Sequence, residues 1–238
     1  MERPSASRTM KLVIFYLDQT LVDLITLHNE TTHQVFRAVF GVDAGLTEVD
    51  FAGRSLKENF AALAKLKNIS EEKFREKSQE LLKRYEERFV EHFPEEPSRY
   101  ILPGAKELLK NLSKTEHVVS LYTGNSPRIV DKVLATTRLA RYFRFCAYGT
   151  EVNSRSDMVR IAIKRAEELT KRRFRGKDIV IVGDSVRDIE CGREFQALTI
   201  AVATGFHSEK ELLEQKPDYI FKDLRDTAQV LQAISFRD

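Results

Sequence analysis

The sequence predicts an α/β fold, a doubly wound and mostly parallel sheet with an inserted α-helical cap. The first observation is that short β-branched runs alternate with amphipathic helical stretches in the second half of the chain, as in a parallel sheet with both faces covered. The second is that residues 24–100 show helical periodicity and no convincing strand. We therefore expect a core of residues 10–23 and 101–238, a cap of residues 24–100, and a disordered tail at residues 1–9.

The strands of this core are expected at apolar runs between turn signals, and the helices in the gaps between them. The strand candidates are residues 11–17, 117–122, 144–148, 178–182, 198–202 and 218–221. One helix is expected to begin near Pro127, since proline suits the first helical position and Ser126 suits the N-cap before it. Further helices are expected at about residues 157–170, 187–195, 208–214 and 224–234.

The cap segment leaves the core directly after the first strand. Within it, residues 71–93 carry charges on one helix face and apolar side chains on the other. The chain returns at Pro103 and Gly104, a turn signal that precedes a helix and the next strand. We therefore expect the cap to be a small helical bundle.

Composition narrows the classes of partner. The 238 residues include 39 basic and 36 acidic side chains, a formal net charge of +3, with no uninterrupted basic stripe, so we expect no nucleic-acid binding. No apolar run approaches the roughly 18 residues that span a bilayer, and the first ten residues lack a secretory signal, so we expect no membrane role and a cytoplasmic protein. The sequence leaves open whether it is a monomer or a homodimer.

Polar residues follow several of the expected strands. Tyr16, Asp18 and Thr20 come at or after the end of the first strand, residues 123–125 (Thr-Gly-Asn) after the second, and Asp184 after the fourth. Ligands of open α/β sheets bind outside the carboxyl ends of the parallel strands. We therefore expect these side chains to surround one pocket.

This ordered set resembles the four motifs of the haloacid dehalogenase (HAD) superfamily of phosphatases, whose first motif is D-x-D-x-T. Residues 121–127 (LYTGNSP) and 181–188 (IVGDSVRD) look most like the phosphoglycolate-phosphatase-like branch. The resemblance implies a HAD-like Rossmannoid core with a C1-type cap. It also implies Mg²⁺-dependent hydrolysis of a small phosphorylated metabolite through an aspartyl-phosphate intermediate.

The resemblance also implies roles for individual residues. Asp18 matches the general acid and base, and its backbone carbonyl matches a metal ligand, as do Asp184 and Asp188. Arg155 takes the place of the third-motif cation, for which Lys132 and Lys164 are the alternatives. The residues expected to contact the substrate or its phosphate are Thr20, Arg54, Thr123, Gly124 and Asn125.

Tyr16 occupies the position of the family's nucleophilic aspartate. A carboxylate has an ordinary pKa near 3.9 and a phenol one near 10, so the tyrosine is protonated at pH 7 and a poor nucleophile. It also removes a metal ligand and places a ring where the phosphate should lie. We therefore expect this chain to be inactive or impaired.

Three explanations of Tyr16 stay open: a phosphatase whose aspartate has been replaced, a natural non-catalytic phosphate-binding pseudoenzyme, and an enzyme with altered chemistry. A β-phosphoglucomutase-like phosphotransferase is a weaker alternative. The five histidines share no metal-ligand spacing, so we expect them to be structural or exposed. They are His28, His33, His92, His117 and His207.

Overall fold

The computed structural model describes residues 10–94, 96–151 and 154–236, and the predicted tail at residues 1–9 lies outside them. Its sheet is six-stranded and parallel, in the order β3-β2-β1-β4-β5-β6, which confirms the predicted fold class. The strands are β1 (Leu12–Tyr16), β2 (Val118–Thr123), β3 (Cys146–Tyr148), β4 (Ile179–Gly183), β5 (Leu198–Val202) and β6 (Tyr219–Phe221).

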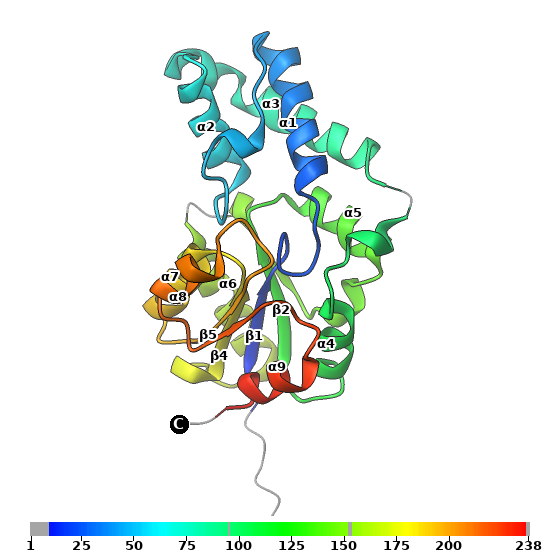
Figure 1. Ribbon diagram of the computed structural model, residues 1–238, viewed down its shortest axis with the longest axis vertical. Coiled ribbons are helices and arrows are strands. Elements are labelled where there is room, and N and C mark those ends of the chain that lie inside the picture. The colour runs from blue at the N-terminus through cyan, green and yellow to red at the C-terminus, as the bar shows by residue number, and fades with distance from the viewer. Residues whose placement is uncertain (1–9, 95, 152–153, 237–238) are drawn as a thin grey trace, which may run out of the picture.

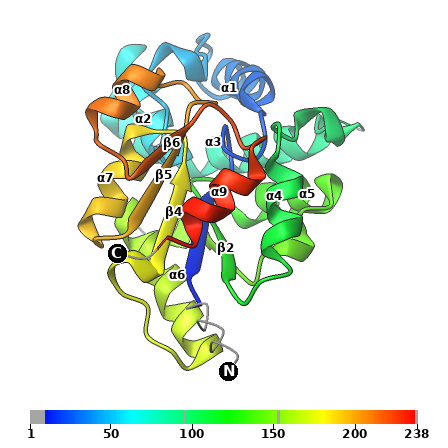
Figure 2. The same ribbon diagram turned by 60° about the horizontal axis from the view of Figure 1, so that its bottom comes forward.

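Helices cover both faces of the sheet. On one face lie α4 (Ala105–Leu112), α5 (Pro127–Thr137) and α9 (Thr227–Ile234), and on the other lie α6 (Arg155–Thr170) and α7 (Val186–Glu194) (Figure 2). Helix α8 (Glu209–Glu214) contacts α7 and β6. This arrangement is a doubly wound sheet.

Three helices lie together beyond the carboxyl ends of the strands: α1 (Ile25–Phe40), α2 (Leu56–Leu66) and α3 (Glu71–Glu91) (Figure 1). Their shared interior is aromatic, and each of the following side chains is fully buried: Phe36, Phe60, Tyr85 and Phe89. These side chains belong to the same buried apolar cluster as the α4 face of the sheet. The three helices are therefore packed onto the core rather than tethered to it.

The alternation of side chains along β1 determines towards which face of the sheet Tyr16 points. All five of its residues are buried, and alternate side chains of a strand point to opposite faces. Val13 and Phe15 accordingly join the cluster on the α4 side, whereas Leu12, Ile14 and Tyr16 join the one on the α6 side. Tyr16 therefore projects towards the start of α6.

The predicted elements agree with the structure except at some ends. Helix α6 begins two residues before the expected position, because Ser154 caps it by accepting a hydrogen bond from the Asp157 backbone N–H. Ser126 is the N-cap of α5 as predicted, but its hydroxyl makes no capping bond. The strand expected at residues 144–148 is shorter and is limited to β3.

Candidate active site

Residues that follow separate strands meet at the carboxyl edge of the sheet. A cavity lies there. Its lower wall includes Tyr16, Asp18, Asn125 and Asp184, and its upper wall includes residues 51–54, the loop that precedes α2. The fold thus brings together side chains that the sequence separates by more than 160 positions.

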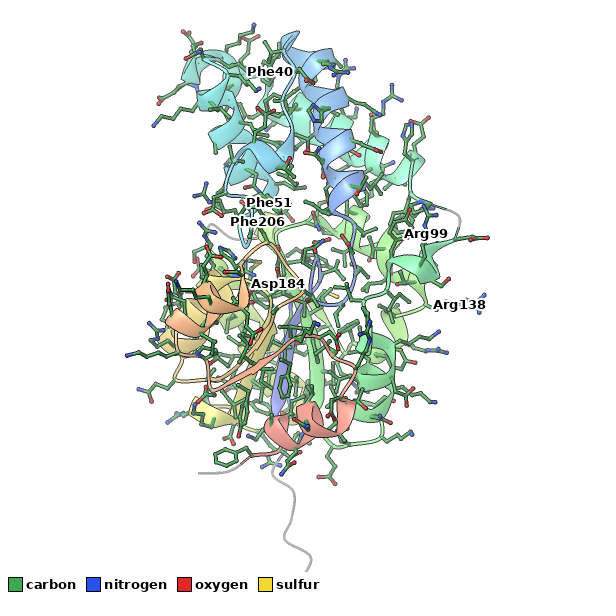
Figure 3. All side chains as sticks on the ribbon, viewed as in Figure 1. Phe40, Phe51, Arg99, Arg138, Asp184 and Phe206 are labelled. Carbon is green, nitrogen blue, oxygen red and sulfur yellow. The ribbon has the colours of Figure 1, made fainter. Side chains whose placement is uncertain are left out.

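The loop before α2 is fastened to the core beside this cavity. Phe51 lies above Asp184, and its ring packs edge-on against the ring of Phe206, with ring centroids 5.3 Å apart (Figure 3). Arg187 pairs with Asp50 at 2.5 Å and also donates a hydrogen bond of 2.5 Å to the Ala52 carbonyl. The cavity is therefore covered from the α2 side.

Tyr16 is only 7% exposed and lies between two other side chains. The guanidinium carbon of Arg155 lies 4.3 Å from the centre of the Tyr16 ring, and the Tyr122 ring packs edge-on with centroids 5.4 Å apart. Burial raises the pKa of the Tyr16 hydroxyl well above its ordinary value, and the nearby Arg155 charge only partly offsets this. This shift further disfavours the ionised form of the hydroxyl.

Arg155 and Asp188 form a buried ion pair, with side chains 11% and 2% exposed. Arg155 also donates to the Gly53 carbonyl, across the cavity edge, and its guanidinium carbon lies 4.9 Å from the centre of the Tyr122 ring. Of the two alternative cations, Lys164 is exposed and pairs with Glu168, and Lys132 lies over the Phe93 ring. Arg155 is thus the candidate of the three that contacts Tyr16.

Asp188 is engaged on both of its carboxylate oxygens. Oδ1 accepts hydrogen bonds from the Tyr122 hydroxyl and from Arg155 Nη2. Oδ2 accepts from the Ser185 backbone N–H at 2.9 Å and from the Ser185 hydroxyl at 2.7 Å, which forms the capping box of α7. This carboxylate therefore fixes the start of a helix.

Asp18 is held by two side chains. Asn125 Nδ2 donates to Oδ2 at 2.7 Å, and His28 Nε2 lies 3.2 Å from Oδ1. His28 Nδ1 in turn lies 2.5 Å from the Tyr85 hydroxyl. With Tyr85 donating to Nδ1, the ring carries its proton on Nε2 and donates to Asp18.

His28 is the site residue that sequence reasoning missed. His28 belongs to no metal-ligand spacing, so motif reasoning did not single it out. Its two partners lie in other elements: Asp18 in the loop after β1 and Tyr85 in α3. The signal that could have found it is helical periodicity, since His28, Thr31, Thr32 and Val35 form one buried face of α1. A histidine on such a face, ten residues after an aspartate at a strand end, merits testing as a partner for it.

The other predicted residues are distributed around the cavity. Thr20 is buried and donates to Asp184 Oδ1 at 2.8 Å, and the hydroxyl of buried Thr123 accepts from the Asn125 backbone N–H at 3.2 Å. Gly124 and Arg54 both line the cavity. A Cβ on Gly124 would lie 2.7 Å from the Arg54 carbonyl oxygen, so glycine allows the two backbones to approach closely.

Magnesium prefers several carboxylate, carbonyl and water oxygens in octahedral geometry. Asp184 lines the cavity and offers one carboxylate, and burial together with the Asp188 charge raises its pKa. Tyr16 supplies a neutral phenol, and Asp188 is already engaged. Within residues 10–94, 96–151 and 154–236, no group of three or more His, Cys, Asp or Glu side chains is arranged to hold a metal ion. The donor set of this chain therefore does not fit Mg²⁺.

A family model of haloacid dehalogenase-like hydrolases matches residues 13–202, which include β1 to β5. The chain belongs to this family. The resemblance drawn from the motifs is thus confirmed, and by family the chain is a phosphatase-type hydrolase.

Curated relatives place it near one branch of the family. It is 23% identical to the phosphoglycolate phosphatase of Vibrio cholerae over 229 residues, 94% of this chain and 98% of that protein. It is also 23% identical to the phosphoglycolate phosphatase of Synechococcus elongatus over 139 residues, 58% of this chain and 61% of that protein. With this second relative, the match spans about three fifths of the relative's length.

Solved structures of the family share the fold. A β-phosphoglucomutase from Clostridium difficile superposes with a TM-score of 0.75 at 17% identity, covering 95% of this chain and 97% of that one. A hydrolase from Pseudomonas syringae gives a TM-score of 0.75 at 18% identity, covering 94% of this chain and 99% of that one.

No helix in the described part of the chain is long and apolar enough to cross a membrane.

Proposed function

We propose that this chain derives from Mg²⁺-dependent phosphatases of small phosphorylated metabolites and has lost the covalent step itself. The observation that carries the proposal is Tyr16. It is a buried, protonated phenol at the position where the family's aspartate would form the aspartyl-phosphate. The function retained is ligand binding in the cavity between the strand ends and residues 51–54.

The surroundings of Tyr16 support this proposal. A tyrosine can act as a nucleophile only when a neighbouring base takes its proton. Asp18 is the nearest candidate along the chain, but it is already oriented by His28 and Asn125. Arg155 lies against the ring of Tyr16 rather than beside a free oxyanion. The family's general acid and base is thus retained beside a position that has no nucleophile.

The second candidate is an active phosphatase scaffold in which a single replacement at position 16 stops turnover. The arrangement of Asp18 favours it, because a carboxylate oriented by two side chains at the cavity wall suits transfer of a proton to or from a ligand. A phosphotransferase acting on sugar phosphates is the third possibility. A test for phosphoryl transfer to sugar rather than to water separates it from the others.

The test compares p-nitrophenyl phosphate hydrolysis with Mg²⁺ by the unchanged protein, Tyr16→Asp, and Tyr16→Asp with Asp18→Asn. We expect no turnover by the unchanged protein. In a damaged enzyme, Tyr16→Asp gains at least about a hundredfold over that background, and Asp18→Asn abolishes the gain. If Tyr16→Asp stays inactive, the pseudoenzyme is favoured. Family-level hydrolysis by the unchanged protein would refute the proposal.

A further inference from the structure

Arg155 is a buried cation immobilised on all sides. Its guanidinium lies near the ring centres of Tyr16 and Tyr122, at 4.3 and 4.9 Å, distances at which a cation is attracted to the ring face. It is paired with Asp188 and donates to the Gly53 carbonyl. A planar guanidinium suits this environment better than an ammonium, because it can stack on rings while its edge donates several hydrogen bonds.

The two rings that enclose Arg155 are adjacent because of strand register. Tyr16 of β1 and Tyr122 of β2 are direct register partners and point to the same face of the sheet. The Tyr122 hydroxyl also donates to the Asp188 oxygen that accepts from Arg155. Tyr16, Tyr122, Arg155 and Asp188 therefore form one connected unit, which we call the arginine cluster.

The arginine cluster uses the groups that a metal ion would need. Asp188 has no oxygen without a hydrogen-bond donor, and an aspartate is lacking at position 16. Of the expected ligands, the Asp184 carboxylate and the Asp18 backbone carbonyl remain, and one oxygen of Asp184 accepts from Thr20.

We propose that Arg155 is a built-in cation that replaces the divalent metal at this site, so that the chain takes up no Mg²⁺ there. The proposal rests on the proposed function in one respect, the absence of an aspartate at position 16. It goes further, because it assigns the metal's charge-neutralising role to a side chain. It also gives a cation partner to the carboxylate of Asp188, whose side chain is only 2% exposed.

The test measures metal binding rather than turnover. The melting temperature is recorded with and without about 10 mM Mg²⁺ at matched ionic strength, for the unchanged protein, Arg155→Gln and Arg187→Gln. Arg187 is the matched control, since it too joins the core to the loop before α2 but lies outside the arginine cluster. We expect Mg²⁺ to leave the unchanged protein and Arg187→Gln unaffected.

Arg155→Gln should melt at a lower temperature, because it leaves Asp188 buried without its cation. It should then recover about 3 °C with Mg²⁺, since the ion replaces the lost charge. Equal responses of all three proteins, or none in Arg155→Gln, would overturn the proposal.

A second measurement does not depend on whether Arg155→Gln folds. In the unchanged protein, paramagnetic Mn²⁺ should cause no selective broadening of the backbone amide signals of Asp18 and Asp184. Selective broadening there would overturn the proposal even if the protein shows no hydrolysis, so its failure is distinct from failure of the proposed function. Conversely, hydrolysis by the unchanged protein in the presence of EDTA would refute the proposed function and leave this inference intact.

Discussion

The chain of hydrogen bonds from Tyr85 through His28 to Asp18 predicts strong energetic coupling between two helices of the cap region. Tyr85 is fully buried in α3, and His28 is 5% exposed in α1. We consider Tyr85→Phe, His28→Leu and the double variant. Each single change leaves a buried polar atom without its partner, whereas the double change removes both atoms.

The magnitudes follow from that difference. Tyr85→Phe deprives His28 Nδ1 of its donor and should lower the free energy of unfolding by about 1–2 kcal/mol. His28→Leu removes the acceptor of the buried Tyr85 hydroxyl and takes a donor from Asp18, which should cost about 2–3 kcal/mol. The double variant should lose about 2 kcal/mol, so the coupling energy is about 1–3 kcal/mol.

The assay is equilibrium urea unfolding at pH 8, with the free energies compared at a common m-value. Contacts such as the one between the His28 and Phe89 rings, whose centroids are 4.6 Å apart, are altered equally in the single and double variants at position 28 and cancel in the cycle. Additive losses, with a coupling energy below about 0.5 kcal/mol, would refute the hydrogen-bonded chain as described.

Two further changes test the core. Gly104→Ala should lower the free energy of unfolding by about 3 kcal/mol, because the φ of Gly104 is +82° and a Cβ there would lie 1.9 Å from the Leu224 carbonyl oxygen. Urea unfolding measures this loss, and a value below about 1 kcal/mol would contradict the prediction. Burial would raise the pKa of Asp218, but hydrogen bonds from Lys177 and Thr199 outweigh it and hold that pKa below its ordinary value. The ionised Asp218 therefore stabilises the folded protein above the unfolded pKa near 3.9, and this stabilisation is lost as pH falls through the lower folded pKa. Asp218→Asn should accordingly lower the free energy of unfolding by about 1 kcal/mol at pH 7 and by little near pH 3.

The fold could be predicted because its signals are local. Each strand of the core is a short apolar run, and alternation with helical periodicity is enough to predict a parallel sheet. Strand ends in such a sheet gather at one edge, which is why Asp18, Asn125 and Asp184 could be expected around one cavity. At the start of α6 the boundary moved because Ser154 caps the helix.

The contacts within the site could not be predicted, because they depend on register and on helix rotation. Tyr16 and Tyr122 are 106 positions apart, and only the alignment of β1 with β2 makes their rings neighbours. The pairing of Asp188 with Arg155 likewise requires the starts of α6 and α7 to face each other. A motif identifies the residues that a family uses, but it does not specify whether their atoms are available to a ligand.

The surroundings of Tyr16 bear on whether it is an isolated change. A tyrosine placed into a site built for a carboxylate and a metal ion would leave a ring without suitable neighbours. Here the ring contacts Arg155 and Tyr122, and Asp188 is neutralised by Arg155. Such mutual accommodation requires the side chains at positions 16, 122 and 155 to suit one another. Restoring only the aspartate would then recover less activity than the motifs alone suggest, because Arg155 would still bind Asp188.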